Sequence, residues 1–276
     1  MYKRQNLIDK QFYKKIDIQN KIISFGSLYL SNLKVLDVVG ELNRIEEFLQ
    51  GQVTSDITLL PEGGSQLSSI CNQKGLVMAS FLIIKKASKY KIVISKDLIN
   101  IFIDDISPFA KFFSVTFVKS EEIIKGSVEK KDTNPSPFLS NDFFSLSINI
   151  NQHEDKIDCL ISTDEWLIAN KILGNYCLSI DDVEKYRPME LNYDHLRVSF
   201  EKGCYRGQEI VARMKYLGVN RRKFSTIVID HNSNITETFK IFGDIINQKG
   251  FDIFNCMIKR DDLETMNTDE SIKLII

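Results

Sequence analysis

The order of apolar segments in the first 125 residues is the feature that most constrains the fold. Apolar side chains alternate or run together over residues 22–40, a pattern typical of strands, until Gly40 interrupts it. Residues 41–50 instead place their apolar side chains on one helical face, which Gly51 closes. Further strands are expected at 66–72, 76–85, 91–95 and 115–118, and a second helix at 97–110. Strands interrupted by few helices predict an α+β domain in which the helices pack on an antiparallel sheet.

The second half of the chain begins with a polar, proline-bearing connection at 126–142 and then repeats this mixture of elements. Strands are expected near 143–150 and 157–162. Ser162 and Glu165 have the spacing of a capping box for the helix that follows them. After Arg222 only short strands are expected, which suits a small terminal barrel or sheet. We therefore expect three parts, at 1–125, 126–220 and 221–276.

Net charge and hydropathy give no sign of a membrane or nucleic-acid partner for the chain as a whole. With 36 basic and 37 acidic side chains, any polyanion must be met by a local patch. No apolar run approaches the ~20 residues that span a bilayer, and the polar start leads into no signal-peptide core. We therefore expect a cytoplasmic protein with no membrane partner.

One of the five cysteines stands in a distinct setting. There is no CxxC pair and no cysteine–histidine cluster at zinc spacing, so we expect no metal site. Cys204 lies on a glycine-bearing loop that leads into a helix starting near Gln208. The helix N-terminus and the flanking Lys202 and Arg206 favour the thiolate, which is the reactive form. The alternative is a small buried packing residue, which is our interpretation of the cysteines at 71, 159, 177 and 256.

The segment 202–223 is strongly basic in an otherwise neutral chain. It holds seven basic residues and one acidic residue, Glu209, which gives a local charge of about +6. Such a segment suits an anion site, either for a polyanionic ligand tail or for RNA phosphate. The alternative is a solvated helix face. The histidines at 153, 195 and 231 are isolated and are expected to be structural or exposed.

The octapeptide at 202–209, Lys-Gly-Cys-Tyr-Arg-Gly-Gln-Glu, matches the YgfZ-family signature K-G-C-Y-x-G-Q-E at every defined position. Three further segments are similar to the same family, at 48–56, 71–75 and 188–194. The chain thus resembles the family from about residue 22 to about residue 223. The resemblance implies the fold of the glycine-cleavage T-protein aminomethyltransferase. That fold has two α+β halves around a central folate channel, followed by a small C-terminal β-barrel.

The same resemblance implies a function. It predicts a protein that binds tetrahydrofolate or a derivative and supports iron–sulfur client enzymes, such as tRNA methylthiotransferase, rather than catalysing a metabolic step. The motif residues carry over as Cys204 (the reactive thiol), Lys202, Tyr205, Gln208 and Glu209. The predicted folate-binding residues are Gln52, Thr54, Asn72, Lys74, Lys171, Asn192 and Arg213.

Two departures from the family pattern affect the predicted folate contacts. Leu76 follows Gly75 where the family usually has arginine. Lys171 stands where the family typically has another arginine, so the charge is kept and the bidentate fork is lost.

Two other functions are weighed against this one. A true aminomethyltransferase carries an acidic pair a few residues after a glycine, to handle protons at the folate. The corresponding stretch, 75–80, has no carboxylate. An RNA-binding module would use the basic segment, but it ranks last because the sequence shows no obvious aromatic stacking platform.

Overall fold

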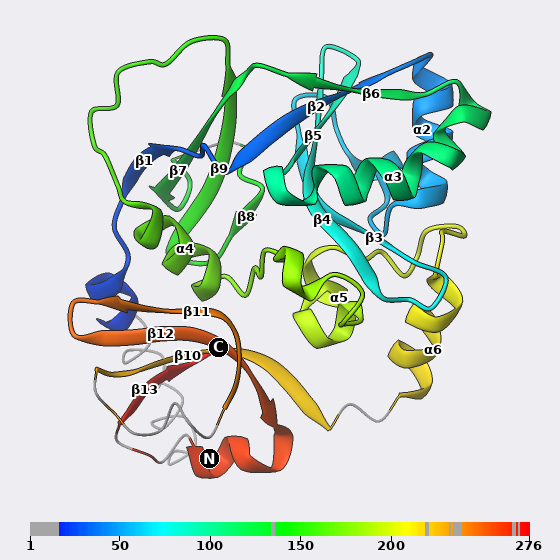
Figure 1. The fold of residues 1–276 in the computed structure, drawn as a ribbon. Coiled ribbons are helices and arrows are strands. Elements are labelled where there is room, and N and C mark those ends of the chain that lie inside the picture. Colours follow the sequence, from blue (N-terminus) through cyan, green and yellow to red (C-terminus); the bar gives the residue numbers. More distant parts are fainter. Residues whose placement is uncertain are drawn as a thin grey trace.

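The computed structural model describes residues 17–133, 136–218, 221–231, 233, 239–266, 269 and 271–276. These residues form an α+β fold with three antiparallel sheets (Figure 1). Among them, no helix is long and apolar enough to cross a membrane.

The first sheet has five strands in the order β3-β4-β5-β2-β6. The strands are β2 (Leu33–Val39), β3 (Ser65–Cys71), β4 (Val77–Lys86), β5 (Lys89–Ser95) and β6 (Thr116–Ser120). Helices α2 (Leu42–Gln52) and α3 (Ile99–Ala110) cover one face of it (Figure 1). These elements confirm the predicted order. Gly51 lies inside α2 and does not end it, because the Val53 N–H still bonds to the Leu49 carbonyl (2.9 Å).

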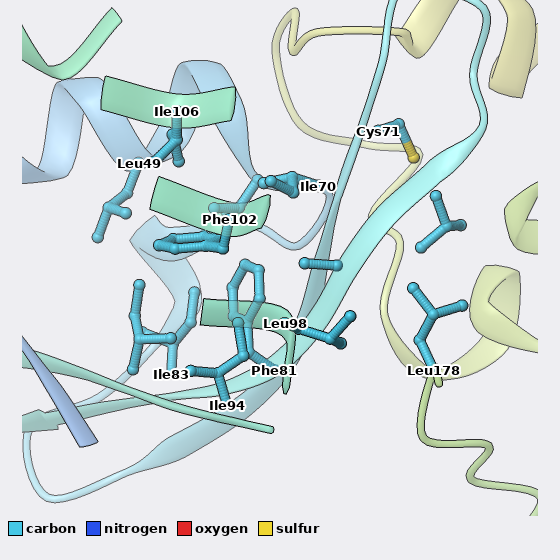
Figure 2. Close-up of a cluster of buried hydrophobic side chains, with 14 of the residues drawn as sticks. Leu49, Ile70, Cys71, Phe81, Ile83, Ile94, Leu98, Phe102, Ile106 and Leu178 are labelled. Atoms are coloured by element: carbon cyan, nitrogen blue, oxygen red, sulfur yellow. The ribbon is translucent and has the colours of Figure 1, made fainter. Parts of the chain in front are cut away.

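The core between this sheet and its helices reaches into the second half of the chain. Figure 2 shows Phe102 of α3 among the sheet side chains Phe81, Ile83 and Ile94, with Leu178 at the opposite end of the cluster. The Phe81 and Phe102 rings meet edge to face, with centroids 5.2 Å apart. Leu191, Tyr193, Val211 and Phe224 belong to the same cluster. The first sheet is therefore the platform on which the segment around the octapeptide is built.

The second sheet has the order β1-β7-β9-β8. Its strands are β1 (Gly26–Tyr29), β7 (Ile123–Lys130), β8 (Leu139–Ser140) and β9 (Phe144–Asn151). The helix α4 (Thr163–Ile172) packs against it and starts with the predicted capping box of Ser162 and Glu165. The predicted boundary between 125 and 126 falls inside β7, and the division into three parts stays a prediction.

Two local expectations for this region are wrong. Residues 17–22 are helical, so Ile22 does not start a strand. Residues 157–162 form no regular strand, because their pairing with β1 is limited to an isolated bridge between Ser27 and Leu160 and the flanking backbone bonds.

The C-terminal sheet has the order β11-β12-β10-β13. Its strands are β10 (Arg222–Asp230), β11 (Lys240–Gln248), β12 (Phe251–Lys259) and β13 (Ile272–Ile275). It encloses its own small apolar cluster, which includes Phe254 and Cys256, and contacts α4 through β11 and β12. The remaining helices are α5 (Tyr193–Leu196), α6 (Gln208–Leu217) and α7 (Leu263–Met266). Short 3₁₀ turns occupy Ile57–Leu59, Lys96–Leu98, Lys111–Phe113, Ile180–Asp182, Pro188–Leu191 and Arg260–Asp262.

Candidate functional site

Lys202 anchors the start of the motif loop, residues 202–207. Its ammonium group donates hydrogen bonds to the carbonyl oxygens of Gln50 (2.7 Å), Val53 (2.7 Å) and Ser55 (2.9 Å). These carbonyls lie at and just beyond the C-terminal end of α2, where the helix dipole favours a cation. Lys202 is only 6% exposed, and this burial lowers the pKa of its ammonium group to about 8. The side chain thus fastens the loop to the C-terminal end of α2.

Tyr205 and Arg206 anchor the other side of Cys204. The Tyr205 side chain is buried. The Arg206 guanidinium forms a two-bonded ion pair with Asp105 of α3 and lies 5.1 Å from the centre of the Phe109 ring. Between these fixed neighbours, Cys204 is exposed. Lys202 and Arg206, the cations expected to favour a thiolate, are therefore bound to other partners, and the sulfur of Cys204 is exposed to solvent.

Gly207 joins the motif loop to α6 and sets this helix against the turn at 71–75. Its φ is +83°, a left-handed conformation that glycine adopts without strain. A Cβ atom at this position would lie 2.4 Å from the carbonyl oxygen of Asn72. One at Gly75 would lie 3.1 Å from the Cβ of Ile210 in α6. Two of the segments that resemble the YgfZ family are thus packed directly together.

The polar motif residues around this contact differ in exposure. The Asn72 side-chain oxygen accepts the backbone N–H of Lys74 (2.9 Å), whose side chain is exposed. Gln208 accepts a backbone hydrogen bond from within the motif loop (3.3 Å). Glu209 and Arg213 form an exposed ion pair one helical turn apart (3.0 Å). These three contacts shape the turn and the helix, and the catalytic or folate-binding roles of the residues that make them stay predictions.

A cavity of about 80 Å³ lies between the first sheet and α4, lined by strands β3 to β5, by α4 and by the segment 175–178. Arg197 is its charged lining residue. The Arg197 guanidinium donates to the carbonyls of Ser68 and Phe81 (both 3.0 Å) and to the Asn175 side-chain oxygen (2.7 Å). Its buried Nε has no hydrogen-bond partner among the described residues. The lining of the cavity therefore includes a buried guanidinium that three protein acceptors hold in place.

The cysteines do not all lie as expected. Cys71 and Cys256 are buried, whereas Cys159 and Cys177 are exposed, so the expectation of four packed cysteines is wrong for these two. Cys159 lies in the irregular segment beside β1, where its thiol donates to the Phe25 carbonyl (3.1 Å). The exposed surface of Cys177 faces the central cavity. Surrounding protein atoms desolvate the sulfur, which raises the pKa of the Cys177 thiol.

Two of the predicted folate contacts, Thr54 and Asn192, lie behind the cavity lining. The buried Thr54 hydroxyl donates to the Arg197 carbonyl (2.7 Å). The Asn192 amide donates to the Gly174 carbonyl (3.1 Å), just before the segment that enters the cavity. Both side chains therefore position lining residues.

The two remaining predicted folate contacts, Lys171 and Gln52, do not line the cavity. The buried Lys171 ammonium donates to the Asn255 side chain of β12 (3.2 Å), and burial lowers its pKa. The Gln52 side-chain oxygen is buried without a partner among the described residues. The described residues that line the central cavity include none of the seven predicted folate contacts. Those roles remain predictions.

Five residues of the cavity lining were not predicted from the sequence: Trp166, Asn170, Asn175, Cys177 and Arg197. Three weak signals were available. Trp166 is the only tryptophan in the chain. Asn175 and Cys177 directly follow Gly174, whose φ of +69° marks a turn. Arg197 lies between the apolar residues Leu196 and Val198, and a buried arginine requires several acceptors.

Comparisons with known proteins find similar sequences and a similar solved structure. No family model matches the chain. An uncharacterized protein of Haemophilus influenzae is 31% identical over 197 residues, which cover 70% of each chain. The tRNA-modifying protein YgfZ of Hamiltonella defensa is 25% identical over 244 residues (76% of this chain, 72% of the relative). That of Vibrio atlanticus is 24% identical over 226 residues (72% and 68%).

A solved structure defines the class of fold. The glycine cleavage system aminomethyltransferase T of Bartonella henselae superposes with a TM-score of 0.55 at 13% identity, covering 89% of this chain and 81% of its own. The protein therefore has the aminomethyltransferase T fold, an α+β fold. Within that class, the chain belongs to the YgfZ family, whose matched members are named tRNA-modifying proteins.

Proposed function

We propose that this protein binds tetrahydrofolate or a derivative in its central cavity and supports the assembly or repair of iron–sulfur enzymes, including those that modify tRNA. Cys204 is its reactive group. Its clients are cytoplasmic enzymes of the tRNA methylthiotransferase type. Two features of the structure support this function beyond the family membership: the exposed Cys204 on the motif loop and the chemistry of the central cavity.

One observation carries the proposal: Cys204 is exposed between neighbours that are fixed on both sides. Lys202 makes three carbonyl contacts, and Arg206 makes a bidentate ion pair. Buried cysteines act as small apolar packing residues, whereas a reactive thiol must be accessible. A loop that is anchored by the buried Lys202 and by the ion pair of Arg206, and that leaves its sulfur in solvent, suits a group that meets a partner.

The chemistry of the central cavity fits a pterin ring. Trp166 and the nearby Phe138, with ring centroids 6.3 Å apart, offer aromatic surface, and Asn170 and Asn175 offer amides. Arg197 places a positive charge in the lining. The volume of about 80 Å³ lies below the ~300–1,000 Å³ of ligand pockets. The cavity therefore has to widen to admit a whole folate.

The same cavity disfavours the aminomethyltransferase alternative. Its described lining residues include no aspartate or glutamate. The stretch at 75–80, which corresponds to the acidic pair of the enzyme, leads into β4, and Ser80 is its polar residue at the cavity. Without a carboxylate beside the ligand, no side chain of the usual type takes up a proton there.

The test is calorimetric titration with tetrahydrofolate, using a variant that fills the cavity. Cys177→Phe adds an aromatic ring to the lining and is expected to abolish saturable binding. Cys159→Phe, at an exposed position beside β1, is the matched control and is expected to bind like the unmodified protein. Absence of binding at millimolar tetrahydrofolate would refute folate binding. Equal binding by Cys177→Phe would refute the central cavity as the site.

A further inference from the structure

A second and larger cavity, of about 450 Å³, lies between α6, the α5 region and the C-terminal sheet. We call it the basic pocket. Five cations line it: Lys215, Arg221, Arg222, Lys240 and Arg260. Two carboxylates, Glu190 and Asp194, oppose them, which leaves an excess of three positive charges when His195 is counted as neutral. The pocket is separate from both Cys204 and the central cavity, whose lining residues it does not share.

The arginines of the basic pocket are available to a ligand. Lys215 is paired with Asp194 (3.0 Å), and the Lys240 ammonium lies 4.8 Å from the centre of the Tyr186 ring. By contrast, the exposed side chains of Arg221, Arg222 and Arg260 form no ion pair within the described part of the chain. Three unpaired guanidinium groups around one concavity suit phosphate oxygens, which match their donor geometry.

An exposed aromatic side chain, Tyr216, lies on α6, the helix that contributes Lys215 to the basic pocket. Tyr216 is 67% exposed and its neighbour Leu217 is 79% exposed. The Tyr216 ring meets the Phe200 ring at a centroid distance of 6.1 Å, and the Lys215 ammonium lies 5.0 Å from the centre of the Phe200 ring. Lys215 thus contacts the aromatic pair and also lines the basic pocket. This arrangement supplies the stacking platform that was not visible in the sequence.

We propose that the basic pocket and Tyr216 together bind single-stranded RNA. The three arginines hold phosphates of the backbone, and a base stacks on the exposed face of the Tyr216 ring. Proteins that bind single strands combine a positively charged groove with aromatic side chains in this way. A small anion or a γ-glutamyl tail uses the arginines but leaves the exposed Tyr216 without a role. The proposal does not depend on folate binding.

The test is fluorescence anisotropy with a labelled uridine decamer over a range of salt concentrations. The double variant Arg222→Gln/Arg260→Gln removes two phosphate contacts, so the salt slope of log K is expected to fall by about 1.4, at ~0.7 per contact for single strands. Tyr216→Ala is expected to weaken binding at least about fivefold with the slope unchanged, since stacking contributes ~1–3 kcal/mol per base. The control is Lys86→Gln/Lys89→Gln, two exposed lysines on the β4–β5 hairpin.

Any one of three results overturns the proposal. The first is that the unmodified protein fails to bind the probe. The second is that the control loses as much affinity and salt slope as the arginine variant, and the third is that Tyr216→Ala binds normally. Displacement of the probe by penta-γ-glutamate at matched ionic strength, combined with normal binding by Tyr216→Ala, assigns the pocket to a carboxylate tail instead.

Discussion

Replacing Gly207 with alanine is expected to destabilise the protein more than any conformational effect alone explains. Gly207 has a φ of +83°, and a Cβ atom there would lie 2.4 Å from the Asn72 carbonyl oxygen. The first feature strains the backbone of any L-residue with a side chain. The second forces α6 and the turn at 71–75 apart, because the neighbouring atom belongs to the backbone and cannot rotate away.

The two contributions are separable in magnitude. A non-glycine residue in the left-handed region costs about 1–2 kcal/mol. Forcing an extra methyl group into a packed contact costs a further ~1–3 kcal/mol. Gly207→Ala should therefore lower the free energy of unfolding by about 2–5 kcal/mol. Gly250 offers a matched control, because its φ is +82° and a Cβ atom there would meet nothing within 4 Å. Gly250→Ala should cost only the first contribution, about 1–2 kcal/mol.

The assay is urea denaturation followed by circular dichroism, with both variants compared with the unmodified protein at equal m-values. The difference between the two variants isolates the contact between α6 and the Asn72 turn. If Gly207→Ala destabilises the protein no more than Gly250→Ala does, the octapeptide does not pack on this turn, and the geometry of the motif loop described above is wrong.

Three further predictions concern the motif and the cavity. Because burial lowers the pKa of Lys202 from 10.5 to about 8, the native protein releases this proton before the unfolded chain does. The free energy of unfolding should therefore gain up to about 3 kcal/mol relative to Lys202→Met as pH rises from about 8 to 10.5, and a flat difference curve would contradict this. Limited iodoacetamide treatment and peptide mapping should find Cys204 alkylated first, ahead of Cys159, whose thiol is held by the Phe25 carbonyl; late reaction of Cys204 would make it a structural residue. Added to the other glycine-cleavage components in place of their transferase, the protein should show no sustained methylenetetrahydrofolate formation, and turnover would favour the aminomethyltransferase alternative.

The fold was largely predictable because local sequence patterns specify most of its helices and strands. The apolar face of α2, the capping box of α4 and the run that forms α6 each depend on residues within one or two helical turns. Strand β7 escaped the prediction because Lys125, Gly126 and Glu129 make its sequence read as polar connection. Its place in the sheet depends on partners more than a dozen residues away, β1 and β9.

The candidate sites were predictable only where one short segment carries them. The octapeptide gave Cys204 and its neighbours directly. The central cavity did not follow from the sequence, because Arg197, Asn175 and Trp166 come from separate segments and meet only in the folded chain. The exposure of Tyr216 is likewise a property of the folded surface, since its spacing within α6 does not distinguish it from a packed aromatic.

The most direct test of the account is complementation of bacterial cells that lack their own YgfZ, with the methylthiolated adenosine content of tRNA measured by mass spectrometry. The unmodified protein and the control Cys159→Ser are expected to restore the modification. Cys204→Ser is expected to fail, because it removes the reactive thiol. Its protein level should stay equal, because the side chain is exposed and its replacement does not disturb the packing. Full restoration by Cys204→Ser would contradict the assignment of this thiol as the reactive group.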